Sequence, residues 1–188
     1  RDAVEKAKAA KPPTERERDY IAAVGAFYQD PGAGGYPARA LAFEQAMERV
    51  PRRYPDDREA GIFYGLALLG NAPPSDKTYA RQKKAAEILN KILPDAPEHP
   101  GIAHYIIHSF DYPQLAALAL PAANAYSKIA PSAPHALHMP SHIFTRLALW
   151  DQSIESNLAS AQAGRRYVER TQPGAAHYEE LHALDYLA

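Results

Sequence analysis

The chain has 188 residues, of which 21 are basic, 22 are acidic and none is cysteine. A formal net charge of −1, with both signs spread along the chain, excludes the basic surface by which proteins bind nucleic acid. The absence of cysteine excludes disulfides and thiolate metal ligands. No apolar run approaches the ~20 residues that span a bilayer, so we expect no membrane insertion. Composition leaves a cytoplasmic and an exported, periplasmic location equally open.

Amphipathic helices are expected from the first residue onward. The opening RDAVEKAKAA is typical of the end of a helix, closed by prolines at 12–13, so a longer chain is expected before Arg1. Thr14 begins the next helix, because Glu17 three residues later completes a capping box. Apolar residues then recur at helical spacing up to the glycine-rich loop at 30–35. A second helix follows and ends before Tyr54.

The same pattern of paired helices continues to the end of the chain. Asp56 and Glu59 repeat the capping-box spacing at the start of the next helix. Prolines and glycines then delimit further helices, which we expect at 56–70, 79–93, from Pro100, at 113–130, at 151–170 and from Pro173. No segment alternates with period two over a useful length, so no sheet is expected. The predicted fold class is all-α.

A repeat of about 35–43 residues organises these helices into helix–turn–helix pairs. Each pair is too small to bury its own apolar stripe and must stack on its neighbours. The sequence therefore predicts a right-handed α-solenoid of tetratricopeptide-like repeats, a single domain over 1–188 that belongs to a longer array. The approximate repeats are 14–54, 57–94, 98–130, 134–170 and a truncated 173–188.

An internal match supports the repeat. PGIAHY at 100–105 and PGAAHY at 173–178 agree at five of six positions, and PHALHM at 134–139 shares their proline and histidine. Proline is well tolerated at the first position of a helix, where its missing N–H would be unpaired. We therefore expect three short helices, each with proline first and histidine four residues later: Pro100/His104, Pro134/His138 and Pro173/His177.

Histidines are confined to the second half of the chain and point to a metal site. His104 and His108 are four apart, as are His138 and His142, so each pair projects from one helix face. Imidazoles from two neighbouring helices can converge on one ion, and this donor suits zinc, copper and iron. The predicted ligands are His104, His108, His138, His142, His177 and His182.

Other side chains near these histidines could bind a ligand or orient the imidazoles. The candidates are Tyr105, Asp111, His135, Tyr178 and Asp185, with Glu98 as a further carboxylate. The HExxH signature with its adjacent general base is missing. A simpler interpretation is that buried histidines form a structural hydrogen-bond network with the tyrosines.

Two prolines are expected to interrupt helices. Pro140 lies between His138 and His142, and Pro121 lies within LAALALPAANAY. A proline inside a helix removes a backbone hydrogen bond and bends the axis. The bend at Pro140 could either aim the two histidines or serve the curvature of a solenoid.

The segments HPGIAHYIIHSFDYPQLAALALP and APHALHMPSHIFTRLALWDQSIESN resemble a family of bacterial tetratricopeptide-repeat-containing proteins of uncharacterised function. The resemblance extends back through RERDYI and YPDDREAGIFYGLALL, and so covers nearly the whole chain. It implies an α-solenoid and, by analogy, a concave groove that binds peptide or protein. It implies no particular reaction.

Three functional hypotheses follow. The leading one is a scaffold that binds a peptide or protein partner in a concave groove lined by histidines. The alternative is a metalloprotein, or a metal-dependent enzyme, with a histidine-rich site between adjacent inner helices. The third is a structural unit that self-associates through its solenoid surfaces.

Overall fold

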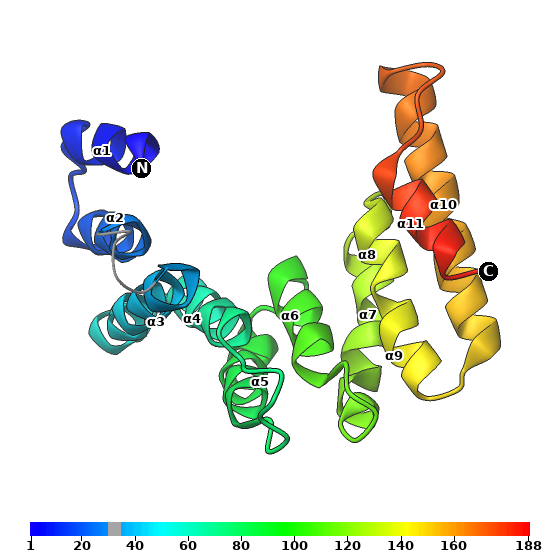
Figure 1. Ribbon diagram of the computed structural model, residues 1–188, viewed down its shortest axis with the longest axis horizontal. Coiled ribbons are helices and arrows are strands. Elements are labelled where there is room, and N and C mark those ends of the chain that lie inside the picture. Colours follow the sequence, from blue (N-terminus) through cyan, green and yellow to red (C-terminus); the bar gives the residue numbers. More distant parts are fainter. Residues whose placement is uncertain (30–34) are drawn as a thin grey trace. The chain divides into compact units, whose positions relative to one another are not determined.

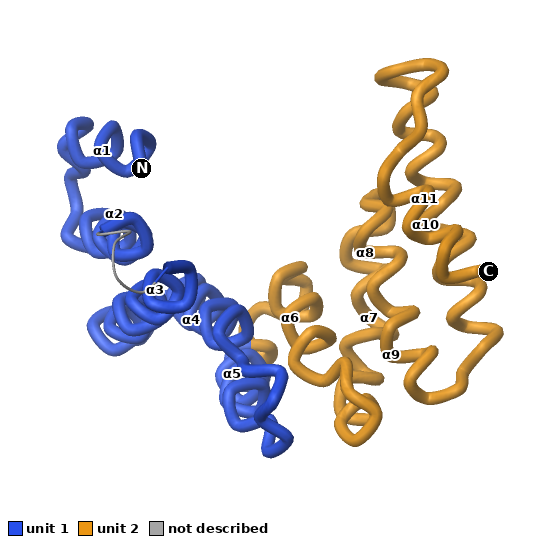
Figure 2. Tube along the Cα trace, in the orientation of Figure 1, with its two compact units in different colours: residues 1–92 blue, residues 93–188 orange. Residues whose placement is uncertain are grey.

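The computed structural model describes residues 1–29 and 35–188, and every regular element in these ranges is helical (Figure 1). The loop predicted at 30–35 lies outside the described residues, apart from Gly35. The chain divides into two compact units, residues 1–92 and residues 93–188, where the sequence predicted one domain (Figure 2). The boundary falls two residues before the end of the second predicted repeat, 57–94.

The described residues of unit 1 form five helices, each packed on the next along the chain. Their bounds are α1 Asp2–Ala9, α2 Glu15–Tyr28, α3 Gly35–Arg53, α4 Arg58–Gly70 and α5 Ala80–Ile92. The capping box predicted at Thr14 and Glu17 is present at the start of α2. The one predicted at Asp56 is wrong, because α4 is preceded by Asp57, whose side chain makes no cap bond. Asp57 instead accepts hydrogen bonds from Arg16 and Tyr20 of α2.

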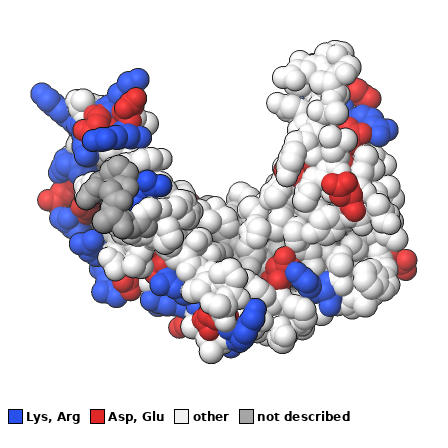
Figure 3. Space-filling model, in the orientation of Figure 1, with Lys and Arg blue, Asp and Glu red and all other residues white. Residues whose placement is uncertain are grey.

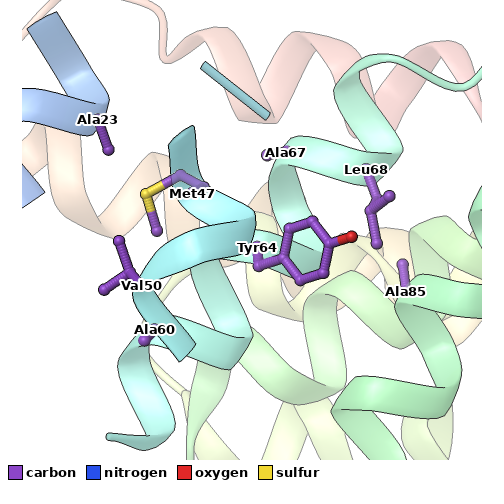
Figure 4. Packing of buried hydrophobic residues seen from close by; sticks show 8 residues of the cluster. All are labelled: Ala23, Met47, Val50, Ala60, Tyr64, Ala67, Leu68 and Ala85. Atoms are coloured by element: carbon purple, nitrogen blue, oxygen red, sulfur yellow. The ribbon is translucent and has the colours of Figure 1, made fainter. Parts of the chain in front are cut away.

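The core of unit 1 lies among α2, α3, α4 and α5 (Figure 4). Alanines at the contacts keep the helices close, and Met47 of α3 and Leu68 of α4 fill the remaining space. Val50 and Ala60 are also almost fully buried. Each Å² of apolar surface removed from water stabilises the folded state by about 25 cal/mol. This packing is therefore the main source of the unit's stability.

Replacing Thr14 with alanine should lower the free energy of unfolding by about 1 kcal/mol. The hydroxyl of Thr14 accepts from the backbone N–H of Glu17 at 3.1 Å, and alanine leaves that donor without its partner. Urea unfolding followed by circular dichroism measures the change. Thr14→Ser is the matched control and should retain most of the stability, so equal losses in both variants would contradict this role of the hydroxyl.

Unit 2 contains the histidines and, beside the long helix α10, consists mostly of short helices. Its elements are η1 Leu93–Asp95, α6 Pro100–Phe110, η2 Ala116–Ala119, α7 Leu120–Ile129, α8 Pro134–His138, α9 Pro140–Arg146, α10 Trp150–Thr171 and α11 Tyr178–Asp185. The long helix α10 packs against α8, α9 and α11, and α7 packs against α6 and α9. The short helices α8, α9 and α11 therefore all lie against α10 (Figure 1).

Prolines set the helix boundaries in unit 2. The helix predicted at 113–130 is wrong in its first part, because a 3₁₀ turn precedes α7 and Pro121 lies in the first turn of α7 rather than in its interior. Pro140 separates α8 from α9, as expected for a residue that cannot donate a backbone hydrogen bond. Met139 between them keeps helical dihedral angles, so the chain follows a nearly helical path through the break.

The helix predicted from Pro173 is also wrong. Residues 173–177 form a turn and an extended stretch, in which Gly174 has φ +89°, and α11 begins only at Tyr178. His177 is therefore the residue before a helix, whereas His104 and His138 lie inside helices. Ala175 is exposed, whereas the residues at the matching position of α6 and α8, Ile102 and Ala136, are buried.

The charged side chains are unevenly distributed between the units. Lysines and arginines gather over unit 1 in Figure 3, and most of them precede residue 93 in the sequence. In residues 93–188 the acidic residues outnumber the basic ones.

Among the described residues, no helix combines the length and the apolar character that crossing a membrane requires.

Candidate metal centre

Six of the eight histidines come together in unit 2 as two groups of three. Within the described residues, no other group of three or more His, Asp or Glu side chains is arranged to hold a metal ion. In each group the ligand atoms all lie within 4.8 Å of one another. We call them triad 1 and triad 2, and together the histidine cluster. Triad 1 is His104, His108 and His135, and triad 2 is His138, His142 and His182.

Triad 1 begins with two histidines on α6. Their spacing of four residues places both rings on the same helix face, with ring centroids 4.7 Å apart and Nε2 atoms 3.0 Å apart. His135, from the first turn of α8, brings its Nε2 atom within 3.1 Å of the Nε2 atom of His104. The opposite face of α6 is anchored by Ile102, Ile106 and Ile107, which are buried, so the histidine face is fixed in direction.

Triad 2 begins on α8 and α9, on either side of Pro140. The Nε2 atoms of His138 and His142 lie 3.0 Å apart across the break. His182 of α11 brings its ring to 4.5 Å from the ring of His138, measured between centroids. The triad therefore requires α11 to be packed in place.

The short helix α8 is held by a polar stripe on α10. Ser156 donates a hydrogen bond to the backbone oxygen of Leu137, and Ser160 donates to that of Pro134 at 2.8 Å. These bonds join the backbone of α8 directly to side chains of α10. They also fix the position of α8, which contributes one histidine to each triad.

The Nδ1 atoms of three histidines face hydrogen-bond acceptors. His138 Nδ1 lies 2.7 Å from Oδ1 of the buried Asn157, His142 Nδ1 lies 3.0 Å from a carboxylate oxygen of Asp111, and His135 Nδ1 lies 3.3 Å from a carboxylate oxygen of Glu179. Asn157 is oriented by its own amide nitrogen, which donates to the backbone oxygen of Ser153 at 2.9 Å. An acceptor at Nδ1 places the ring hydrogen there and leaves Nε2 with a lone pair.

The consequence is most direct in triad 2. His138 and His142 both donate through Nδ1, so in their neutral forms neither carries a hydrogen on Nε2. Two Nε2 lone pairs then face each other at 3.0 Å, which is unfavourable unless a cation lies beside them. In triad 1, Nε2 of His104 contacts two other ring nitrogens and carries at most one hydrogen to share between them.

Burial makes it unfavourable for a proton to supply the positive charge that the facing Nε2 lone pairs require. Removal from water lowers the pKa of His138 to about 4, which outweighs the opposing effect of its bond to Asn157. In triad 1, burial and then the charges of His108 and His135 lower the pKa of His104 to about 3. Both side chains are therefore neutral near pH 7, the form in which imidazole binds a metal ion.

Asp111 stays ionised beside triad 2. Burial would raise the pKa of Asp111, but the hydrogen bonds that it accepts from His142 and Arg146 outweigh this effect and lower it. A carboxylate that accepts from Nδ1 makes the imidazole a better electron donor at Nε2. Asp111, predicted as a ligand-binding residue, therefore lies in the outer sphere of the cluster.

Aromatic rings flank both triads. Tyr126 stacks on His104 at 5.4 Å between centroids, and Tyr105 lies against the same ring at 5.3 Å. Tyr186 packs edge-on against His138 at 4.7 Å, and its hydroxyl lies 3.4 Å from Nδ1 of His142. Apolar rings around a metal site reduce its contact with water and hold the imidazoles in place.

Three of the predicted site residues lie apart from the ligand atoms. His177 accepts a hydrogen bond from the backbone N–H of Glu179 and caps α11, and its ring packs against Tyr167 instead of the triads. Tyr178 is exposed and stacks on the far side of His182. Asp185 is exposed at the end of α11 and belongs to neither triad.

Four residues that contact the cluster or Asp111 were not predicted from the sequence: Asn157, Glu179, Arg146 and Tyr186. For Asn157 a signal was available, because Ser153, Asn157 and Ser160 recur at helical spacing and form a buried polar stripe. Glu179 and Tyr186 had no such signal, since they reach the cluster only through the packing of α11. Glu179 lies in the first turn of α11, where acidic residues are common because they interact favourably with the helix dipole. Its position in the sequence therefore does not distinguish it from an ordinary helix-start residue.

Comparison with protein-family models, with curated proteins and with solved structures finds no match for this chain. The case for a function therefore stands on the geometry of the histidine cluster.

Proposed function

We propose that the protein binds transition-metal ions through the histidine cluster. The observation that carries the proposal is the pair of hydrogen bonds at Nδ1 of His138 and His142, which leaves their Nε2 lone pairs facing each other. This arrangement of an acceptor, an imidazole and a metal-facing nitrogen is typical of metal ligands. A purely structural network would instead pair each ring nitrogen with a donor or an acceptor of the opposite kind.

The donor set favours zinc or copper. Each triad offers three imidazole nitrogens, whereas calcium and magnesium prefer oxygen ligands. Nitrogen atoms about 3 Å apart suit an ion bound at roughly 2.0–2.1 Å from each, the usual zinc–histidine distance. Iron and nickel also accept imidazole, so the metal supplied in the experiment should be varied.

Elemental analysis tests the proposal. The chain, purified with an affinity tag that contains no histidine, should retain zinc or copper after dialysis against metal-free buffer. A double variant, His104→Gln with His142→Gln, should lose it, because one ligand is removed from each triad. His99→Ala changes a histidine outside the cluster and should bind metal like the parent chain.

No bound metal after supplementation with zinc, copper and anaerobic ferrous iron would overturn the proposal. Equal retention by the double variant would overturn it too, since the metal would then lie elsewhere. Circular dichroism of each variant separates loss of ligands from loss of fold.

We further propose that the helix pairs are tetratricopeptide-type repeats of the family that the sequence resembles. Consecutive packing of α2 on α3, of α4 on α5 and of α6 on α7 supports this architecture. A peptide groove lined by histidines receives less support than the metal centre, because the rings contact one another and the flanking tyrosines.

A further inference from the structure

We infer that the two triads form one dinuclear centre, in which each triad holds one ion and the pair binds a small bridging anion. The inference rests on the proposed function and deepens it. A single ion bound by one triad would leave the proposed function intact but would contradict the inference.

The triads adjoin through α8. His135 and His138 are three residues apart on this helix, and they belong to different triads. Their ring centroids are 6.4 Å apart, which is 1.5 Å more than the 4.9 Å that separates His104 and His135 within triad 1. Ions bound at the Nε2 atoms of these two rings would therefore occupy neighbouring positions.

The triads also adjoin through His142. Its Nδ1 atom lies 3.0 Å from a carboxylate oxygen of Asp111, the residue that directly follows α6. Helix α9, which carries His142, packs against α6, which carries His104 and His108. The cluster is therefore continuous through α9 as well as through α8.

Each triad leaves coordination positions open. Three imidazoles satisfy three positions of an ion that takes four or more, a pattern shared by catalytic zinc sites, where the remaining position holds water or substrate. Beside triad 1, Oε2 of Glu179 is buried and has no hydrogen-bond partner among the described residues. That oxygen is available to accept a hydrogen bond from water or hydroxide bound to an ion.

The charge balance favours an anion as the bridging ligand. An imidazole that binds a metal ion is neutral, so the charge of two divalent ions would be opposed by Asp111 and Glu179 beside the cluster. Arg146 pairs with Asp111 and offsets one of these carboxylates. The loaded centre would therefore carry a positive charge in partly buried surroundings, where an anion such as hydroxide, azide or phosphate is strongly attracted.

Zinc stoichiometry is the first test. Equilibrium dialysis of the metal-free chain should give two zinc ions per chain, and His99→Ala should also bind two. His104→Gln and His182→Gln each remove one ligand from a different triad and should bind one tight ion each. One ion in the parent chain would overturn the dinuclear centre while leaving metal binding established, whereas no ion would overturn both.

Copper spectroscopy is the second test, because it reports whether the two bound ions lie close to each other. The parent chain with two Cu²⁺ ions should show an electron paramagnetic resonance spectrum altered by coupling between the ions. His182→Gln with one Cu²⁺ ion should show the spectrum of an isolated ion. A parent spectrum that equals the sum of two isolated ions would overturn the pair.

Azide tests the bridging anion on the same copper-loaded chain. A charge-transfer band should appear on addition of azide and should saturate at one azide per two copper ions. Saturation at one azide per copper ion, or no band, would overturn the bridging position. The His182→Gln variant supplies the matched control for azide bound to a single ion.

Discussion

Adding zinc to the metal-free chain should raise its free energy of unfolding by about 4 kcal/mol when free zinc is a thousand times the dissociation constant. The ligands come from α6, α8, α9 and α11, so they converge only in the folded unit, and an ion that binds them stabilises that state. Thermal unfolding at several zinc concentrations measures the effect. A chelator added in excess should reverse it.

Two controls identify the origin of this stabilisation. Magnesium at the same concentration should give none, because imidazole is a poor ligand for it. The variant with both His104→Gln and His142→Gln should lose most of the response to zinc. The same rise in this variant as in the parent chain would contradict binding at the cluster.

Replacing Asn157 with alanine should weaken metal binding at triad 2 by roughly 10–100-fold without removing a ligand. Asn157 fixes the hydrogen of His138 on Nδ1, and alanine allows that hydrogen to move to Nε2, where it blocks the ion. Competition between the protein and a chelator measures the affinity. Binding at triad 1 should remain unchanged in the same sample.

Asn157→Asp separates this positioning role from simple packing. The aspartate keeps an oxygen acceptor facing Nδ1 and should restore most of the affinity that alanine loses. Equal losses in the two variants would show that Asn157 acts only through the packing of α10 against α8. An unchanged affinity in Asn157→Ala would contradict the positioning role altogether.

The sequence predicts the helices of this protein well where local signals decide. The capping box of Thr14 and Glu17 and the break at Pro140 depend on neighbours within a few residues, and both are present. The same holds for His104 and His108, which share a helix face because of their spacing. These features follow from backbone geometry alone.

Features that depend on tertiary packing could not be predicted in this way. PGAAHY at 173–178 resembles the start of α6, yet its first five residues are not helical, and Ala175 is exposed where Ile102 of α6 is buried. The assignment of His135 to triad 1 and of His138 to triad 2 depends on how α6 and α11 pack around α8. The outer-sphere residues Asn157 and Glu179 lie 19 and 44 residues from their histidines.

The separation of the ligands along the chain has a mechanical consequence. An ion in triad 1 would join His108 to His135, and an ion in triad 2 would join His142 to His182, closing loops of roughly 30 and 40 residues. In a chain without cysteine, these links would take the place that disulfides hold in other small domains. Their strength would follow the free metal concentration and would be insensitive to thiol redox conditions.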